Sequence, residues 1–194
     1  ANQPQARLAK VFENEVNKPR RVWFLTLVMF IFATYNICEV GYFTFQTTFF
    51  QSLHHVNITA AEAAEISSIT ATSYTFGRAL SILVPTLISS ATELSGHFVL
   101  TLFSVGLLFW TQITNQLFTR INSGVLGFAL SAIIPAMLSF VNEYAVVDDG
   151  RTAAFFIALR LPSIFIPFLI GPYIEQFPSI LLIIDITSMA LGLI

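Results

Sequence analysis

Long apolar stretches separated by short connections constrain this sequence more than any other feature. A helix crosses a bilayer core about 30 Å thick with about 20 mostly apolar residues. Six stretches of this kind are present: Val22–Phe50, Ala63–Ser89, His97–Asn115, Ile121–Val141, Thr152–Tyr173 and Ser179–Ile194. Because the connections between them are brief, we expect consecutive helices to run antiparallel within one compact bundle.

The composition excludes an ordinary water-soluble fold. Of the 194 residues, 55% are hydrophobic and only 10% are charged, whereas a soluble domain carries about 25% charged residues. A fold of this length could not bury so much apolar surface, because a sizeable part of any small domain stays exposed. The formal net charge of −2 excludes the basic footprint of a nucleic-acid-binding protein. The expected class is an all-α, multi-pass integral membrane protein in a lipid bilayer.

The distribution of basic residues predicts the orientation of the bundle. Five of the nine lie before the first span: Arg7, Lys10, Lys18, Arg20 and Arg21. Under the positive-inside rule, residues 1–21 are predicted to form a cytoplasmic linker arm and residues 22–194 a six-helix transmembrane bundle. The sequence has no initiator Met and ends inside its last apolar stretch, so we interpret it as a fragment of a longer protein with a truncated final helix.

One N-glycosylation sequon, Asn57-Ile58-Thr59, lies between the first and second spans. The predicted orientation places this loop on the outer side of the membrane, which makes Asn57 a candidate glycosylation site. An outer sequon favours the plasma membrane, although an endomembrane fits the same physical pattern.

Four ionisable residues fall within the predicted spans: Glu39, Arg78, Arg160 and Asp185. Each costs at least ~2.5–3.5 kcal/mol at a helix centre, so each needs a partner or water. Two charges of each sign suggest pairing, but the sequence leaves the pairs open. Glu39 and Arg78 differ in height by roughly 9 Å, which is the limit of an arginine's reach. For Arg160 the sequence leaves three interpretations open: its side chain snorkels to the membrane surface, forms a structural salt bridge or contacts the solute.

Polar side chains line one face of each of the first two spans. At ~100° per residue, one stripe occupies an arc of about 80° and the other an arc of about 60°. The stripes are Asn36, Glu39, Phe43 and Gln46 in the first span and Ser67, Ala71, Tyr74 and Arg78 in the second. Two such helices side by side predict a water-accessible cavity. The alternative for the many hydroxyl groups of the second span is packing between membrane helices.

Motifs of catalytic or nucleotide chemistry are absent from the sequence. There is no phosphate-binding loop, nucleophile elbow, HExxH motif, paired catalytic carboxylates or metal-ligand spacing. We therefore expect no enzyme activity, no catalytic residues, no bound metal and no cofactor, and ATP-driven transport cannot reside in this chain.

Short motifs in the first, second and fourth spans resemble those of a known transporter family. The segments Tyr35–Tyr42 and Ser73–Ile82, together with Ile134-Pro135, are similar to the C-terminal half of a major facilitator superfamily transporter. The branch that they most resemble is the sodium-dependent glucose transporter and domain-containing protein 4 group, relatives of the bacterial fucose permeases. This resemblance implies that the six helices form one half of a twelve-helix fold, with a solute cavity facing the missing N-terminal half.

The resemblance can be followed residue by residue at two places. The branch carries a Gly-x-Glu/Gln-Val-like stretch in its seventh helix, matched by the surroundings of Glu39, and Phe-x-x-Gly-Arg in its eighth, matched loosely by Tyr74-Thr75-Phe76-Gly77-Arg78. The fifth span departs from the family pattern. It has Arg160 shortly before Pro162, where the family usually has a small or acidic residue, so the shared substrate is in doubt.

These observations predict secondary active transport of a small polar solute, a sugar, coupled to H⁺ or Na⁺ by alternating access. Asn36, Glu39, Gln46, Tyr74 and Arg78 are the predicted solute and ion pathway, with Arg160 and Asp185 as charge partners. The alternative is a non-transporting membrane protein, with a receptor-like or assembly role, that retains the fold. A channel formed by this chain alone would need polar stripes on most helices, and the sequence has them on two.

Overall fold

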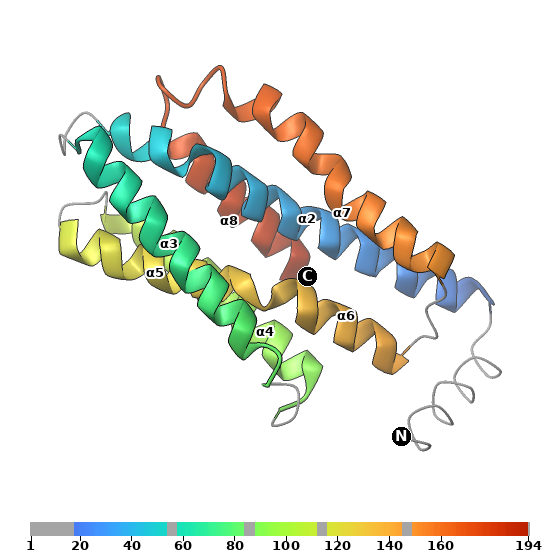
Figure 1. The fold of residues 1–194 in the computed structure, drawn as a ribbon. Helices are drawn as coiled ribbons and strands as arrows, with labels where there is room; N and C mark the ends of the chain where they lie inside the picture. The colour runs from blue at the N-terminus through green and yellow to red at the C-terminus, as the bar shows by residue number, and fades with distance from the viewer. Residues whose placement is uncertain (1–17, 54–57, 84–87, 112–115, 145–148, 194) are drawn as a thin grey trace.

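The computed structural model describes residues 18–53, 58–83, 88–111, 116–144 and 149–193, and their regular structure is helical throughout (Figure 1). The helices are α2 (Lys18–Gln51), α3 (Ala60–Leu80), α4 (Ser90–Thr111), α5 (Gln116–Ser131), α6 (Ile133–Tyr144), α7 (Asp149–Ile170) and α8 (Ser179–Leu193). Only Ala132 separates α5 from α6, so these two together correspond to the fourth predicted span. The prediction of an all-α fold is confirmed over the described residues.

Several helix ends differ from those predicted by hydropathy. Helix α3 ends at Leu80, whereas the second predicted span ended at Ser89. Helix α4 begins at Ser90, whereas the third predicted span began at His97. The reason is local capping: the Ser89 hydroxyl accepts a hydrogen bond from the Thr92 N–H at 3.3 Å, which starts α4 in a polar stretch. The described part of α2 begins at Lys18, inside the predicted arm. Hydropathy measures apolar length, whereas hydrogen bonding sets where a helix starts.

Helix α2 is the centre of the bundle. Its 34 residues extend about 51 Å at ~1.5 Å per residue, and it packs against α7, α8 and α3. Its aromatic side chains Phe32, Tyr35, Tyr42 and Phe49 are fully buried. In Figure 1 α6 continues in the direction of α5, and when these two are taken as one span, consecutive spans alternate in direction, as the short connections predicted. Helix α3 therefore runs in the same direction as α5.

Small residues allow α3 and α5 to approach closely, and this is the most extensive helix contact in the described structure. A Cβ added to Gly127 would lie 2.3 Å from the backbone oxygen of Thr70, and one added to Gly77 would lie 2.1 Å from the Ser131 hydroxyl oxygen. Glycine is therefore required at both positions, as in the small-residue interfaces of membrane helices.

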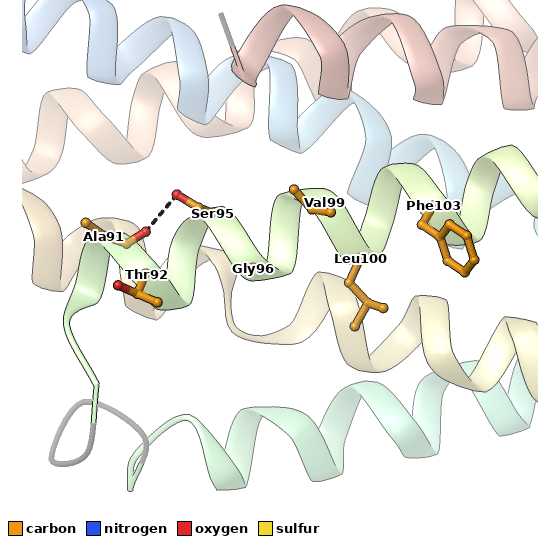
Figure 2. A pocket seen from close by; sticks show the side chains of 7 residues that line it. All are labelled: Ala91, Thr92, Ser95, Gly96, Val99, Leu100 and Phe103. Atoms are coloured by element: carbon orange, nitrogen blue, oxygen red, sulfur yellow. Dashed lines mark hydrogen bonds between the residues drawn. The ribbon is translucent and has the colours of Figure 1, made fainter.

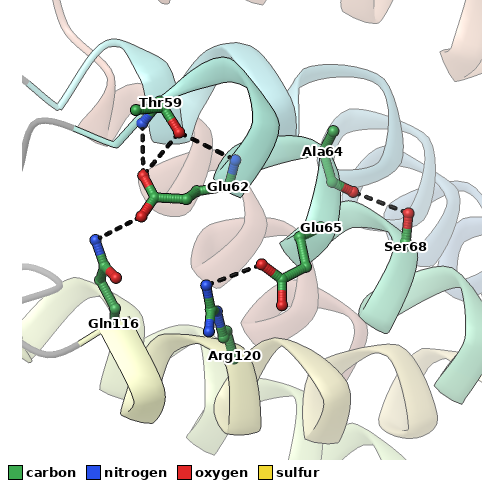
Figure 3. Close-up of polar contacts among 7 residues, drawn as sticks. All are labelled: Thr59, Glu62, Ala64, Glu65, Ser68, Gln116 and Arg120. Carbon is green, nitrogen blue, oxygen red and sulfur yellow. Dashed lines mark hydrogen bonds and ion pairs between the residues drawn. The ribbon is translucent and has the colours of Figure 1, made fainter.

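A polar clasp joins the beginnings of α3 and α5 (Figure 3). Thr59 and Glu62 form a reciprocal capping box at the start of α3, and the other oxygen of Glu62 accepts a hydrogen bond from Gln116 of α5 at 3.2 Å. One turn further on, Arg120 forms a 2.8 Å ion pair with Glu65. Hydrogen bonds from the Thr59 N–H and hydroxyl lower the pKa of Glu62. The clasp fixes α3 on α5 at this end of the bundle.

The capping box provides a test of the local hydrogen bonding. We expect Thr59→Ala to lower the Tm of the detergent-solubilised protein by about 2–4 °C, because the first turn of α3 loses its side-chain cap. Thr72→Ala is the matched control, since the Thr72 hydroxyl only donates to the Ser68 carbonyl within α3. Equal loss of Tm in the two variants would show that the capping box does not stabilise the helix.

Within the described residues, three helical stretches are long and apolar enough to cross a membrane. They are α2 over Trp23–Gln51, α4 over Ser90–Trp110 and the α5–α6 pair over Gln116–Glu143. The apolar parts of α7 and α8, Phe155–Ile170 and Ser179–Leu193, are shorter. The sequence prediction of six spans is thus supported by length and composition for three of them.

Candidate functional site

Glu39, Tyr74 and Arg78 meet where α2 crosses α3. One carboxylate oxygen of Glu39 accepts a hydrogen bond from the Tyr74 hydroxyl and lies 3.6 Å from a guanidinium nitrogen of Arg78. The Arg78 guanidinium also covers the Tyr74 ring, with its central carbon 4.7 Å from the ring centroid. The pairing that the sequence left open is therefore formed.

Helical spacing explains why α3 supplies two of these groups. Tyr74 and Arg78 are four residues apart, so they lie on one face of the helix. The Arg78 side chain is 45% exposed and the Glu39 side chain is 10% exposed. The carboxylate is therefore held inside the bundle, while the guanidinium extends toward the surface and retains free hydrogen-bond donors.

The cluster lines a polar groove of about 310 Å³, formed by Glu39, Val40, Phe43, Thr44, Tyr74, Arg78 and Arg160. Phe43 packs edge-on against Tyr74, with ring centroids 5.0 Å apart. Helices α2, α3 and α7 each contribute to this groove. Its volume falls at the lower end of the range of about 300–1,000 Å³ typical of small-molecule sites.

Arg160 reaches the polar groove from α7, and its side chain is exposed. No carboxylate among the described residues forms an ion pair with it. The Ser163 hydroxyl donates to the Arg160 carbonyl at 2.5 Å and to the Asn36 side-chain oxygen at 3.3 Å. The sequence could not place Arg160 beside Glu39, because that depends on how α7 packs on α2.

Asp185 lies apart from the polar groove, on α8. Its side chain is completely buried, and neither carboxylate oxygen has a hydrogen-bond partner within the standard distance. It faces Gly41 of α2, where an added Cβ would lie 3.6 Å from its oxygen, and the Cys38 thiol interacts with it weakly. Asp185 is thus not an ion-pair partner of Arg160 or Arg78 within the described structure.

The other two polar residues of the α2 stripe point into helix contacts. Asn36 is fully buried and Gln46 is 3% exposed, and neither lines the polar groove. Each retains one buried polar atom without a partner, the Asn36 amide nitrogen and the Gln46 amide oxygen. The structure therefore brings three of the five predicted pathway residues together and leaves these two as buried neighbours.

The hydroxyl groups of α3 mostly bond to their own helix. Thr70, Thr72 and Thr75 each donate to the carbonyl four residues earlier. Thr47 of α2 and Ser67 of α3 form a 2.8 Å hydrogen bond between the two helices. These contacts correspond to the packing alternative for the hydroxyl-rich span.

A larger hollow of about 820 Å³ lies along α4, and it is lined by Ala91, Thr92, Ser95, Gly96, Val99, Leu100 and Phe103 (Figure 2). It carries no charged side chain, and the Ser95 hydroxyl that faces it already donates to the Ala91 carbonyl at 2.8 Å. The polar groove is therefore the better candidate for binding a polar solute.

No cluster of three or more His, Cys, Asp or Glu side chains comes together within the described ranges. Asn57, the predicted glycosylation site, lies outside the described residues, as do residues 1–17 of the predicted arm. The Thr59 of the sequon is described and serves as the cap of α3.

Comparison of the chain with protein-family models, curated proteins and solved structures found no match. The family resemblance rests on the short motifs around Glu39 and Arg78 and stays a prediction. The structure adds one observation: the motifs around Glu39 and Arg78 meet in the polar groove.

Proposed function

We propose that the chain is the C-terminal six-helix half of a secondary active transporter of the major facilitator type. The whole protein would carry a small polar solute of the sugar class, coupled to H⁺ or Na⁺, by alternating access. The observation that carries this proposal is the polar groove, in which Glu39, Tyr74 and Arg78 converge from α2 and α3.

The outer surface of the bundle supports a membrane location. Large apolar side chains remain exposed on several helices, among them Trp23 on α2, Phe103 and Trp110 on α4, and Phe168 on α7. Such a surface would aggregate in water but suits lipid tails. In this proposal all six spans cross the bilayer, residues 1–21 are cytoplasmic, and the plasma membrane is the site of action.

The cluster offers a simple coupling chemistry. Only while it is ionised does the Glu39 carboxylate attract the Arg78 guanidinium and accept a charge-assisted hydrogen bond from the Tyr74 hydroxyl. When it takes up a proton, or when Na⁺ replaces the guanidinium beside it, the attraction to Arg78 weakens. Binding of H⁺ or Na⁺ to Glu39 thereby changes how α3 is held on α2. Alternating access requires a contact of this kind, with two states.

The test is gradient-driven uptake by the complete protein in which this chain occurs. We expect labelled hexose to accumulate in proteoliposomes when an inward pH or Na⁺ gradient is imposed, and not after an ionophore collapses that gradient. Protein-free liposomes provide the background. Correctly inserted protein that moves neither a hexose nor its sugar acid under either gradient would overturn the sugar-transport proposal and favour the non-transporting alternative.

A further inference from the structure

The polar groove carries an excess of positive charge. Its lining includes two arginines, Arg78 and Arg160, and one carboxylate, Glu39. Guanidinium groups stay protonated in proteins, so the groove has a net charge of about +1 with Glu39 ionised. At membrane depth a surplus charge is costly and needs a partner.

The two arginines are available to a ligand to different degrees. The Arg78 guanidinium lies 3.6 Å from the Glu39 carboxylate, which also accepts a hydrogen bond from Tyr74, and the Arg78 side chain is 45% exposed. Arg160 has no ion-pair partner among the described residues and is exposed on the groove side of α7. Its planar fork of donors matches a carboxylate, which it can bind through two parallel hydrogen bonds.

The rest of the lining suits a hydroxylated ring. The edges of Phe43 and Tyr74, together with the Thr44 hydroxyl, provide apolar surface and a hydrogen-bonding group beside the charges. The volume of about 310 Å³ corresponds to about ten water molecules at ~30 Å³ each. That space admits one sugar ring.

We infer that the solute is a monoanionic sugar acid whose carboxylate pairs with Arg160. This inference rests on the proposed transport function and narrows its substrate from sugars in general to those with one negative charge. One carboxylate neutralises the surplus charge of the groove, whereas a neutral hexose leaves it uncompensated. The second guanidinium of the groove, that of Arg160, then selects the anion.

The experiment measures uptake of radiolabelled glucuronate and glucose by proteoliposomes that contain the complete protein. We expect glucuronate to be the better substrate and to inhibit any glucose uptake. Arg160→Gln should raise the KM for glucuronate about tenfold, as one charge-assisted hydrogen-bonded contact is lost, and should leave the maximal rate nearly unchanged. Arg160→Lys should retain part of the affinity, because it keeps the charge but not the fork.

Arg120→Gln is the matched control, because Arg120 is an arginine of α5 that pairs with Glu65 outside the groove. Its KM for glucuronate should equal that of the wild type. Equal KM values in Arg160→Gln and wild type, or glucose uptake that glucuronate does not inhibit, would overturn the sugar-acid inference and leave the transport proposal standing. Absence of uptake of both compounds by correctly inserted protein would overturn both.

Discussion

Gly127→Ala is expected to destabilise the folded chain by about 2–3 kcal/mol or more. The added Cβ would lie 2.3 Å from the Thr70 carbonyl oxygen and 3.0 Å from the carbonyl carbon. Both atoms belong to the backbone of α3, so no side chain can rotate away and the two helices must separate. Overpacking of this kind typically costs about 1–3 kcal/mol, and here the strained contact is the most extensive one in the bundle.

The control for this prediction is Gly106→Ala on α4, where an added Cβ meets nothing within 4 Å. The same chemical change should be neutral or stabilise by about 0.4–1 kcal/mol there, because alanine reduces the freedom of the unfolded chain. Thermal unfolding of the two variants in detergent, with size-exclusion profiles to measure folded yield, gives the comparison. A Gly127→Ala protein as stable as Gly106→Ala would show that α3 and α5 are not packed at this distance.

Glu39→Gln is expected to reduce gradient-driven uptake about thirtyfold while the protein remains folded. The substitution removes the ionised acceptor that the Tyr74 hydroxyl and Arg78 guanidinium share. The charge-assisted hydrogen bond from Tyr74 is worth about 1.5–3 kcal/mol, and the ion pair with the half-exposed Arg78 about 0.2–1 kcal/mol. A loss of about 2 kcal/mol corresponds to roughly thirtyfold in an equilibrium. Glutamine has the same size, and the exposed Arg78 stays solvated, so folding is preserved.

Uptake and the amount of protein in the membrane are measured together for this variant. Glu143→Gln on α6 is the matched control, because Glu143 is exposed and does not line the polar groove. Its uptake should equal that of the wild type. Near-normal uptake by Glu39→Gln would show that Glu39 is not part of the solute and ion pathway. Loss of folded protein in this variant, but not in Glu143→Gln, would show that the carboxylate has a structural role.

Helix formation and helix faces could be predicted from the sequence because both are local properties. The apolar stretches became helices, and the periodicity that put Tyr74 and Arg78 on one face of α3 was sufficient to identify them as a pair. The same periodicity grouped Asn36 and Gln46 with Glu39, yet only Glu39 lines the polar groove. A stripe about 80° wide covers both the edge of the polar groove and the buried helix contacts beside it. Spacing alone therefore could not separate Glu39 from Asn36 and Gln46.

Helix ends were less predictable than helix existence. The polar residues after Ser89 were expected to form a loop, but the Ser89 hydroxyl caps α4 there. The expected start of the fourth span at Ile121 likewise placed Arg120 in a loop, which concealed its ion pair with Glu65 across two helices. In both cases one hydrogen-bonding group outweighed the local hydropathy.

By itself the sequence determined the all-helical class, the apolar surface and the two polar faces of α2 and α3, because these follow from the composition and from the period of a single helix. Only the tertiary structure decided that Glu39 pairs with Arg78, that Arg160 joins their groove and that Asp185 is buried on α8 outside that groove. Those outcomes depend on the crossing angle and axial shift between helices far apart in the chain. The period of a single helix encodes neither quantity, because both arise from the packing of one helix on another.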